Sequence, residues 1–190
     1  TQIFADKVIS NLNPKLLFKK LVDENDVEEE YRRKILNYKC GSGTFRMNVA
    51  LSELPDFNCI PGKEISEHHK SGIVIAPTLT YMDQAFTDAK QYGWSKNPIV
   101  EMLIPSTVDS TLAPEGKHVA SLFCQQFAPV LPRDKSWHDE KEYAASTIID
   151  TVNKFAPNFK ESILGKSILS PLDLEEKLGL VGGDIMHGVM

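Results

Sequence analysis

The stretch Gly43-Thr44-Phe45-Arg46-Met47-Asn48-Val49-Ala50-Leu51, GTFRMNVAL, alternates between apolar residues and residues of other kinds. Successive side chains of a β-strand point to opposite faces, so this pattern predicts a strand with one apolar face. That face carries Phe45, Met47, Val49 and Leu51. An apolar sheet face has to be buried against another layer, so the stretch predicts a sheet covered by helices.

The flanking sequence predicts the other elements of the fold. Further strands are expected in GIVIAPTL (72–79), PIVEMLIPS (98–106) and HVASLFCQQFAP (118–129), and IFADKVISN (3–11) also has a strand-like alternation. Helices are expected from Asn13-Pro14, over about 26–38, from Thr80 to Gly93, over 137–155, and from Ser170 to Gly179. Short turns join several strands, and strands and helices do not alternate regularly. We therefore expect an α+β fold, a mostly antiparallel sheet flanked by helices.

Composition narrows the class of protein. The 190 residues are 42% hydrophobic and carry a formal net charge of −5, which argues against a nucleic-acid partner. No apolar run approaches the roughly 18 residues of a membrane span, and we expect no signal peptide at the start. Cys40, Cys59 and Cys124 are too few and too scattered for a disulfide framework or a Cys-x-x-Cys metal site. We expect a reducing compartment, with the three thiols acting as small apolar residues.

Two candidate ligand sites fail on their context. Residues 41–46, GSGTFR, resemble a dinucleotide fingerprint, but Arg46 replaces the third glycine, and a helix precedes the stretch where a strand is required. His68 and His69 are adjacent, so their side chains point apart and make a poor metal site; we expect a solvated loop. His138, at a helix start among acidic residues, is expected on the surface.

Two further patterns leave alternatives open. One alternative is a small hydrolase that uses Ser106, Asp109 and His118 as its triad, although no activated-nucleophile turn accompanies them. In the closing stretch LVGGDIMHGVM (180–190), Asp184 and His187 are spaced i, i+3 between glycines. The glycines suit close approach of the backbone to a ligand or another segment, and they also suit a plain turn after a helix.

Four stretches follow one another in the order seen in phytoene-desaturase-like FAD-dependent oxidoreductases: ADKVISNLNP (5–14), NVALSELPDF (48–57), IPSTVDSTLAPEGKHVASLFCQ (104–125) and SPLDLEEKLGLVGGDIMHG (170–188). The chain resembles that family over nearly its whole length. The nearest branch is that of the pyridine nucleotide-disulfide oxidoreductase domain-containing proteins. The strongest anchors are NVALSELPDF, TLAPEGKHV and GLVGGDIMHG.

The resemblance implies the middle of a two-domain flavoenzyme. Residues 1–12 would form a strand of the FAD-binding domain, residues 13–180 the substrate-binding domain, and residues 181–190 a glycine-rich segment returning toward the FAD domain. Both FAD-binding glycine motifs of the family are missing, so the chain alone is expected to hold no FAD and to be inactive. In the complete enzyme, flavin would accept a hydride equivalent from the substrate.

The resemblance also suggests site residues, by position only. Cofactor-binding positions would be Ser10, Asn11, Gly182, Gly183 and His187. The apolar wall of the substrate cleft would be Phe45, Met47 and Val49, for which a plain core position is an equal alternative. No catalytic residue and no metal ligand is implied.

The expected partners are a small apolar substrate and the FAD-binding remainder of the same polypeptide. The surface that docks on the missing domain should be apolar, so self-association through it is also expected. The expected location is the cytoplasm, with a peripheral membrane or mitochondrial location as alternatives. A rival hypothesis from another class is a stand-alone binding or interaction module derived from the same fold.

Overall fold

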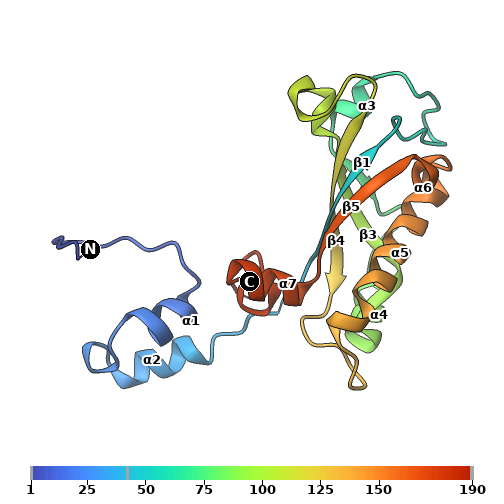
Figure 1. The fold of residues 1–190 in the computed structure, drawn as a ribbon. Helices are drawn as coiled ribbons and strands as arrows, with labels where there is room; N and C mark the ends of the chain where they lie inside the picture. Colours follow the sequence, from blue (N-terminus) through green and yellow to red (C-terminus); the bar gives the residue numbers. More distant parts are fainter. Residues whose placement is uncertain (1, 42, 189–190) are drawn as a thin grey trace.

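A computed structural model describes residues 2–41 and 43–188 of the chain. Its centre is an antiparallel sheet in the order β2-β3-β4-β1-β5, which confirms the predicted α+β class (Figure 1). The strands are β1 Phe45–Leu51, β2 Ile73–Ile75, β3 Trp94–Leu103, β4 His118–Phe127 and β5 Ile163–Leu169. The stretch that predicts the fold is thus an inner strand, between β4 and β5.

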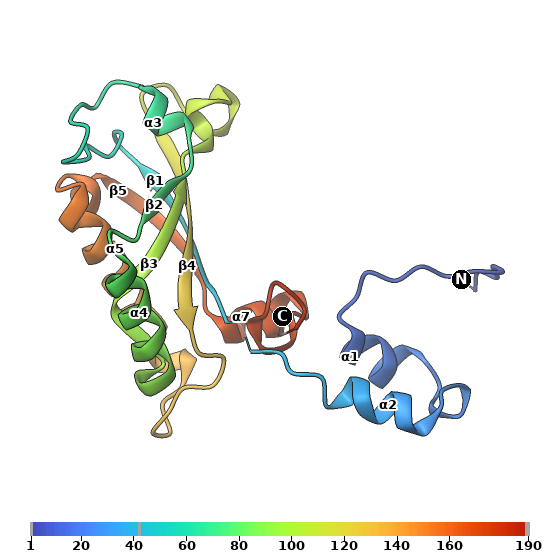
Figure 2. The same cartoon turned by 180° about the vertical axis from the view of Figure 1, so that it is seen from behind.

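The core lies between one face of this sheet and two helices, α4 Leu79–Tyr92 and α5 Trp137–Phe155 (Figure 2). In β1, Phe45 and Met47 are fully buried, and in the register of the sheet they face the same way as Cys124 and Leu122 of β4. The alternation in the sequence therefore identifies the helix-covered face correctly.

Local capping explains where the main helices begin and end. The Thr78 hydroxyl accepts a hydrogen bond from the backbone N–H of Tyr81, so the cap of α4 lies two residues before the predicted cap, Thr80. Helix α5 has the predicted bounds and is capped by Ser136. Helix α7 Pro171–Leu178 begins with a Ser170 capping box. It ends at Gly179, whose φ of +72° suits glycine.

The N-terminal part stands apart from the sheet. It contains α1 Pro14–Leu16, the π-helical η1 Leu17–Leu21, the 3-10 turn η2 Glu24–Asp26, and α2 Glu29–Leu36. Before them, residues 2–12 extend away from the body as an arm without regular structure (Figure 1). Residues 3–11 thus form no strand here, and their pairing with a strand of an FAD-binding domain stays a prediction. Four large apolar side chains of the arm are 86–98% exposed, namely Ile3, Phe4, Val8 and Ile9, and Leu12 is 46% exposed.

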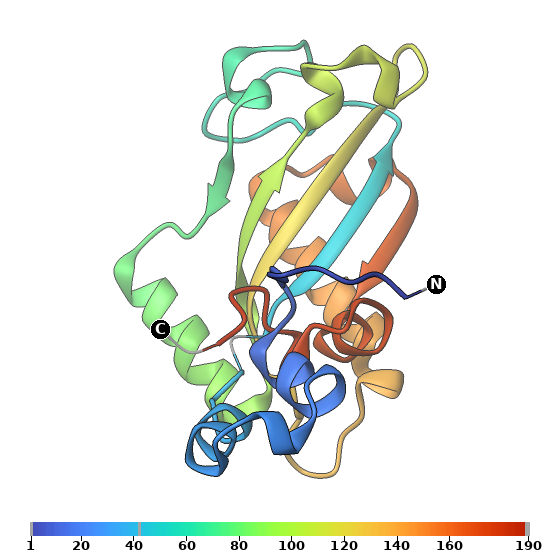
Figure 3. The same cartoon turned by 90° about the vertical axis from the view of Figure 1, so that its left-hand side faces the viewer.

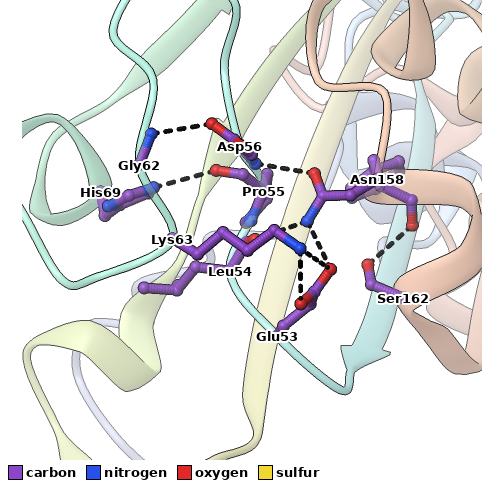
Figure 4. A network of polar contacts seen from close by, with 10 residues as sticks. Glu53, Leu54, Pro55, Asp56, Gly62, Lys63, His69, Asn158 and Ser162 are labelled. Atoms are coloured by element: carbon purple, nitrogen blue, oxygen red, sulfur yellow. Dashed lines mark hydrogen bonds and ion pairs between the residues drawn. The ribbon is translucent and has the colours of Figure 1, made fainter.

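A polar network holds the loop after β1 at the end of the sheet where that strand finishes (Figure 4). Asn158, next to α6 Phe159–Ser162, accepts a hydrogen bond from the Asp56 backbone N–H at 2.7 Å and donates to the Leu54 carbonyl at 2.9 Å. His69, in α3 Glu67–Lys70, lies 3.0 Å from the Pro55 carbonyl and is fully buried. The expectation of a solvated loop is therefore wrong for His69, whose ring takes part in this packing.

Three short 3-10 turns complete the described elements: η3 Pro105–Thr107, η4 Ser110–Leu112 and η5 Val181–Gly183. Of the cysteines, Cys124 is buried and Cys59 is exposed, so the expectation that all three act as small apolar residues fails at Cys59. Within the described part of the chain, every helix is too short or too polar to cross a bilayer.

Candidate functional site

The sheet face that points away from α4 and α5 carries no helix over most of its area (Figure 3). We call it the open face. By the strand register it presents three residues of β1, three of β4, three of β3 and two of β5: Arg46, Asn48, Ala50, Ser121, Phe123, Gln125, Ile99, Glu101, Leu103, Ser167 and Leu169. This face mixes charged, amide, hydroxyl and apolar side chains, so it is not a second core and is a candidate ligand surface.

One cross-strand row dominates the open face. Arg46 is paired in register with Phe123 of β4, which in turn is paired with Glu101 of β3. The guanidinium carbon of Arg46 lies 5.4 Å from the centroid of the Phe123 ring, within cation–π range. The guanidinium also donates a hydrogen bond of 3.2 Å to the Ser121 hydroxyl. The row therefore holds a fixed cation beside an aromatic surface.

At the opposite end of the sheet from the Asn158 network, the glycine-rich C-terminal segment is tied to the start of β1. The Asp184 carboxylate accepts hydrogen bonds from the backbone N–H of Gly41 at 3.0 Å and of Met186 at 2.9 Å. Asp184 also forms a β-bridge with Gly43 and is fully buried. We call this contact the Asp184 junction. It shows that the segment packs on its own chain.

The predicted cofactor-binding glycines take part in the same packing. The Gly182 amide donates to the Glu175 carboxylate at 3.1 Å, and the Gly183 amide donates to the Leu180 carbonyl at 2.8 Å. A Cβ on Gly183 would lie 2.6 Å from backbone atoms of Pro171. Close approach to a neighbouring segment is therefore one reason for glycine here, as one of the two sequence alternatives proposed.

The other predicted cofactor-binding residues lie elsewhere. Ser10 and Asn11 belong to the exposed arm, which Figures 1 and 2 show extending away from the C-terminal segment. His187 has a φ of +62°, and its Nδ1 atom is buried without a hydrogen-bond partner among the described residues. The structure thus does not bring Ser10 and Asn11 to Gly182, Gly183 and His187. Residues 189–190 of the return segment, and Thr1 of the predicted strand domain, lie outside the described residues.

The predicted substrate-binding residues Phe45, Met47 and Val49 are 0–1% exposed and belong to the core under α4 and α5. The structure gives these side chains the core position that the sequence left as an equal alternative. Their role as the wall of a cleft stays a prediction. The residues that sequence reasoning missed are their neighbours Arg46 and Asn48. Their signal was present in the same alternation, because the polar positions of an amphipathic strand define its second face.

A cleft of about 480 Å³ lies beside the Asp184 junction. Its walls come from α4, from the end of β4 and from the C-terminal segment, and include Phe86, Lys90, Phe127 and Met186. The Lys90 ammonium lies 5.2 Å from the centroid of the Phe86 ring. The cleft is mainly apolar and offers one cation, so it is a second place where a small molecule could be held.

The hydrolase alternative finds two of its three residues together. The Ser106 hydroxyl lies 3.4 Å from Nδ1 of His118 and also accepts a hydrogen bond from the Val119 backbone. The Asp109 carboxylate instead binds the hydroxyl and the N–H of Thr111, at 2.6 and 2.9 Å. Burial, with a smaller contribution from His69, lowers the pKa of His118. A Ser–His pair without an orienting carboxylate lacks the arrangement of a catalytic triad.

The described residues do not form a dinucleotide cradle for a flavin. A dinucleotide cradle needs a strand, a glycine turn and a helix whose N-terminal amides face the phosphates. In the described ranges, the glycine-rich stretch at 182–188 follows a helix, and the amides of Gly182 and Gly183 are bonded within the chain. Among the same residues there is no cluster of His, Cys, Asp and Glu suited to a metal ion. The glycine-rich stretch at 182–188 therefore does not have the arrangement of such a cradle.

No protein-family model matches the chain. Curated proteins that are named for a pyridine nucleotide-disulfide oxidoreductase domain are similar to it. The chain is 37% identical over 188 residues to the rat (Rattus norvegicus) pyridine nucleotide-disulfide oxidoreductase domain-containing protein 2 and 36% identical to its mouse (Mus musculus) counterpart. The match covers 96% of this chain and 32% of each relative, so the chain spans about a third of their length.

Proposed function

We propose that this chain is the substrate-binding part of an FAD-dependent oxidoreductase of the phytoene dehydrogenase-like kind, and that the open face is where the substrate lies. The flavin would be bound by sequence that these 190 residues do not include. The similarity to proteins named for an oxidoreductase domain supports the reaction class. The phytoene dehydrogenase-like kind and FAD rest on the resemblance of the four sequence stretches.

The observation that carries the proposal is the asymmetry of the sheet. One face is buried under α4 and α5, while the other presents a row of polar and aromatic side chains with no helix over most of it (Figure 3). An antiparallel sheet commonly leaves one polar face in water, and the open face departs from that pattern because it also carries apolar side chains. Exposed apolar residues of the open face include Leu103, which is 56% exposed. Such a face is suited to enclosing a substrate between itself and a second domain that lies opposite.

The residues of the open face would bind, orient and shield the substrate. A bound flavin would supply the acceptance of electrons. Ser121, Asn48 and Gln125 offer hydrogen bonds, and Phe123 offers a flat apolar contact. The contacts of these side chains give none of them the role of a general acid or base, so the catalytic residues are not assigned.

The exposed arm supports the partner that we propose, the remainder of the same polypeptide. Large apolar side chains that are 86–98% exposed are costly in water and are usual where another segment docks. In this proposal, residues 2–12 pair with the flavin-binding domain. The chain on its own would then self-associate through the arm, and deletion of 2–12 would make it monomeric in analytical ultracentrifugation.

The decisive experiment compares two purified proteins, the 190-residue chain and the complete product of the reading frame that contains it. Visible flavin absorbance is expected in the longer protein and not in the chain. Heat release of the flavin followed by chromatography identifies it as FAD. Flavin held stably by the chain alone, or a colourless longer protein that stays colourless after FAD is added, would contradict the proposal. A reading frame limited to this segment would favour the rival hypothesis of a stand-alone binding module.

A further inference from the structure

The Arg46 guanidinium is a cation on the open face with hydrogen-bond donors to spare. A guanidinium has five N–H donors. Among the described residues, Arg46 donates one hydrogen bond, to Ser121, and forms no ion pair. Its side chain is half-buried, and stacking on Phe123 holds its position. The remaining donors lie in the plane of the group and are free to meet a ligand.

From this geometry we infer that the open face binds an amphipathic anion, with a carboxylate or phosphate on Arg46 and an apolar body along the sheet. A planar guanidinium matches carboxylate and phosphate oxygens in a two-pronged geometry, and prior stacking reduces the entropy lost on binding. This inference rests on the proposed function only in calling the ligand a substrate. Binding itself depends on the residues of the open face alone.

The apolar part of the ligand is indicated by the neighbours of Arg46. Phe123 lies on one side in register and Leu169 on the other. Farther along β3, Leu103 is 56% exposed, and Val74 at the edge of the sheet is 62% exposed. These side chains continue the surface on both sides of the cation. A ligand with only a charged head would leave them in water, so a chain or ring system attached to the head group gains from their burial.

Glu101 places a negative charge at the opposite end of the cross-strand row from Arg46. It is paired with Phe123 on the side away from Arg46, and two strand spacings, about 10 Å, separate the backbones of the two charged residues. No ion pair joins them among the described residues. Glu101 therefore disfavours an anion at its own end and directs the head group to Arg46. Removing this negative charge should strengthen anion binding about twofold at low salt, as expected for unit charges about 10 Å apart in water.

The test uses the 190-residue chain and the probes dodecanoate, dodecyl phosphate, methyl dodecanoate and acetate, with the two dodecyl anions below their micelle-forming concentrations and the ester below its solubility limit. Calorimetry measures affinity, and amide NMR shifts locate the site. We expect both dodecyl anions to bind, with shifts at Asn48, Ser121 and Phe123. The neutral ester and acetate should bind at least tenfold more weakly, because one lacks the charge and the other the apolar body.

The variants separate this site from other cations of the chain. Arg46→Gln should weaken dodecanoate at least tenfold, Arg46→Lys should weaken it less, and Glu101→Gln should strengthen it about twofold. Arg133→Gln is the matched control, because Arg133 also lies over an aromatic ring, 5.8 Å from the Tyr92 centroid, but outside the open face. The affinity of the Arg133→Gln variant for dodecanoate should equal that of the wild type. The melting temperature of each variant is measured first, and Arg46→Lys keeps the test valid if Arg46→Gln does not fold.

Several outcomes would overturn the inference. Equal affinity of wild type and folded Arg46 variants would do so, as would ester binding as tight as that of dodecanoate. Shifts confined to Phe86 and Ala89 would place the ligand in the cleft beside α4 instead. Absence of flavin from the longer protein would refute the proposed function and leave these binding results standing. A flavin-containing protein whose open face binds no anion would refute the inference alone.

Discussion

Replacing Gly183 by Ala tests whether the glycine-rich segment is glycine-rich for the sake of its own packing. Gly183 has a φ of +62°, in the left-handed region that favours glycine. An added Cβ would lie 2.6 Å from the Cα and 2.6 Å from the carbonyl oxygen of Pro171, the first residue of α7. These are backbone atoms, so they cannot turn away as a flexible side chain could.

The two effects can be given separate magnitudes. A left-handed backbone costs an alanine about 1–2 kcal/mol relative to glycine. Forcing one extra carbon into a close-packed contact costs about 1–3 kcal/mol more. Gly182→Ala isolates the first effect, because Gly182 has a φ of +67° but its nearest Cβ contact is 3.4 Å away. Gly165→Ala is the neutral control, because Gly165 has no atom within 4 Å of the added carbon and no positive φ.

The assay is hydrogen exchange at the Gly41 amide, which donates to Asp184 and so reports whether the segment is docked. In Gly183→Ala we expect protection to fall by at least thirtyfold, since about 2 kcal/mol changes an equilibrium constant by roughly that factor. Gly182→Ala should cause a smaller loss, and Gly165→Ala none. Equal protection in Gly182→Ala and Gly183→Ala would refute the steric reasoning. Unchanged protection in both would show that the segment's glycines are not needed for its packing, which would favour a role toward a ligand.

Further predictions concern the remaining packing. Burial raises the pKa of the Asp173 carboxyl, but hydrogen bonds from Lys177, Lys141 and the N-cap residue Ser170 outweigh it and hold the pKa below its usual value. Asp173→Asn should therefore cost about 1–3 kcal/mol at neutral pH, and the difference from wild type should shrink as the pH falls below about 4, measured by urea unfolding. Asn158→Ala should cost about 2–4 kcal/mol because two part-buried backbone groups lose their bonds, whereas Asn58→Ala, with one exposed bond, should cost under about 1 kcal/mol in the same assay. Iodoacetamide should alkylate exposed Cys59 in the native chain but not Cys124, because burial raises the pKa of that thiol and blocks access; peptide mass spectrometry checks this.

Elements with strong local signals were predictable from the sequence. Helix α5 has the predicted bounds, because its apolar spacing is helical over its whole length, and α7 follows from Ser170-Pro171 and Gly179. Strand β5 Ile163–Leu169 was not predicted. Its central residues Gly165 and Lys166 are exposed, and its hydrogen bonds come from β1, more than a hundred residues away. Such a strand is defined by its partner rather than by its own composition.

The candidate site was harder to predict for a related reason. The alternation in β1 correctly divides Phe45 and Met47 from Arg46 and Asn48, but it does not say whether the apolar face packs only on helices or also lines a substrate cleft. An apolar substrate suggests an apolar wall, and the same apolar side chains are what α4 and α5 need for the core. These side chains pack in the core, because a folded chain of this size gains most of its stability from burying such residues together. In our proposal, the substrate therefore lies on the open face, whose composition is mixed.

The positions of the two anchoring contacts explain why that mixed face can serve as a binding platform. At one end of the sheet, Asn158 holds the loop that follows β1; at the other end, Asp184 holds the segment that precedes it. Both contacts act on the ends of the strand that carries Arg46, so its position is set from both directions without any cover over the open face. A side chain held in this way loses little freedom when it meets an anion. Loosening either end should therefore weaken the binding of dodecanoate even though neither anchor touches the ligand. Asn158→Ala and Gly183→Ala should both do so in folded protein, while Asn58→Ala should not; unchanged affinity in both anchor variants would show that the row around Arg46 is held by the sheet alone.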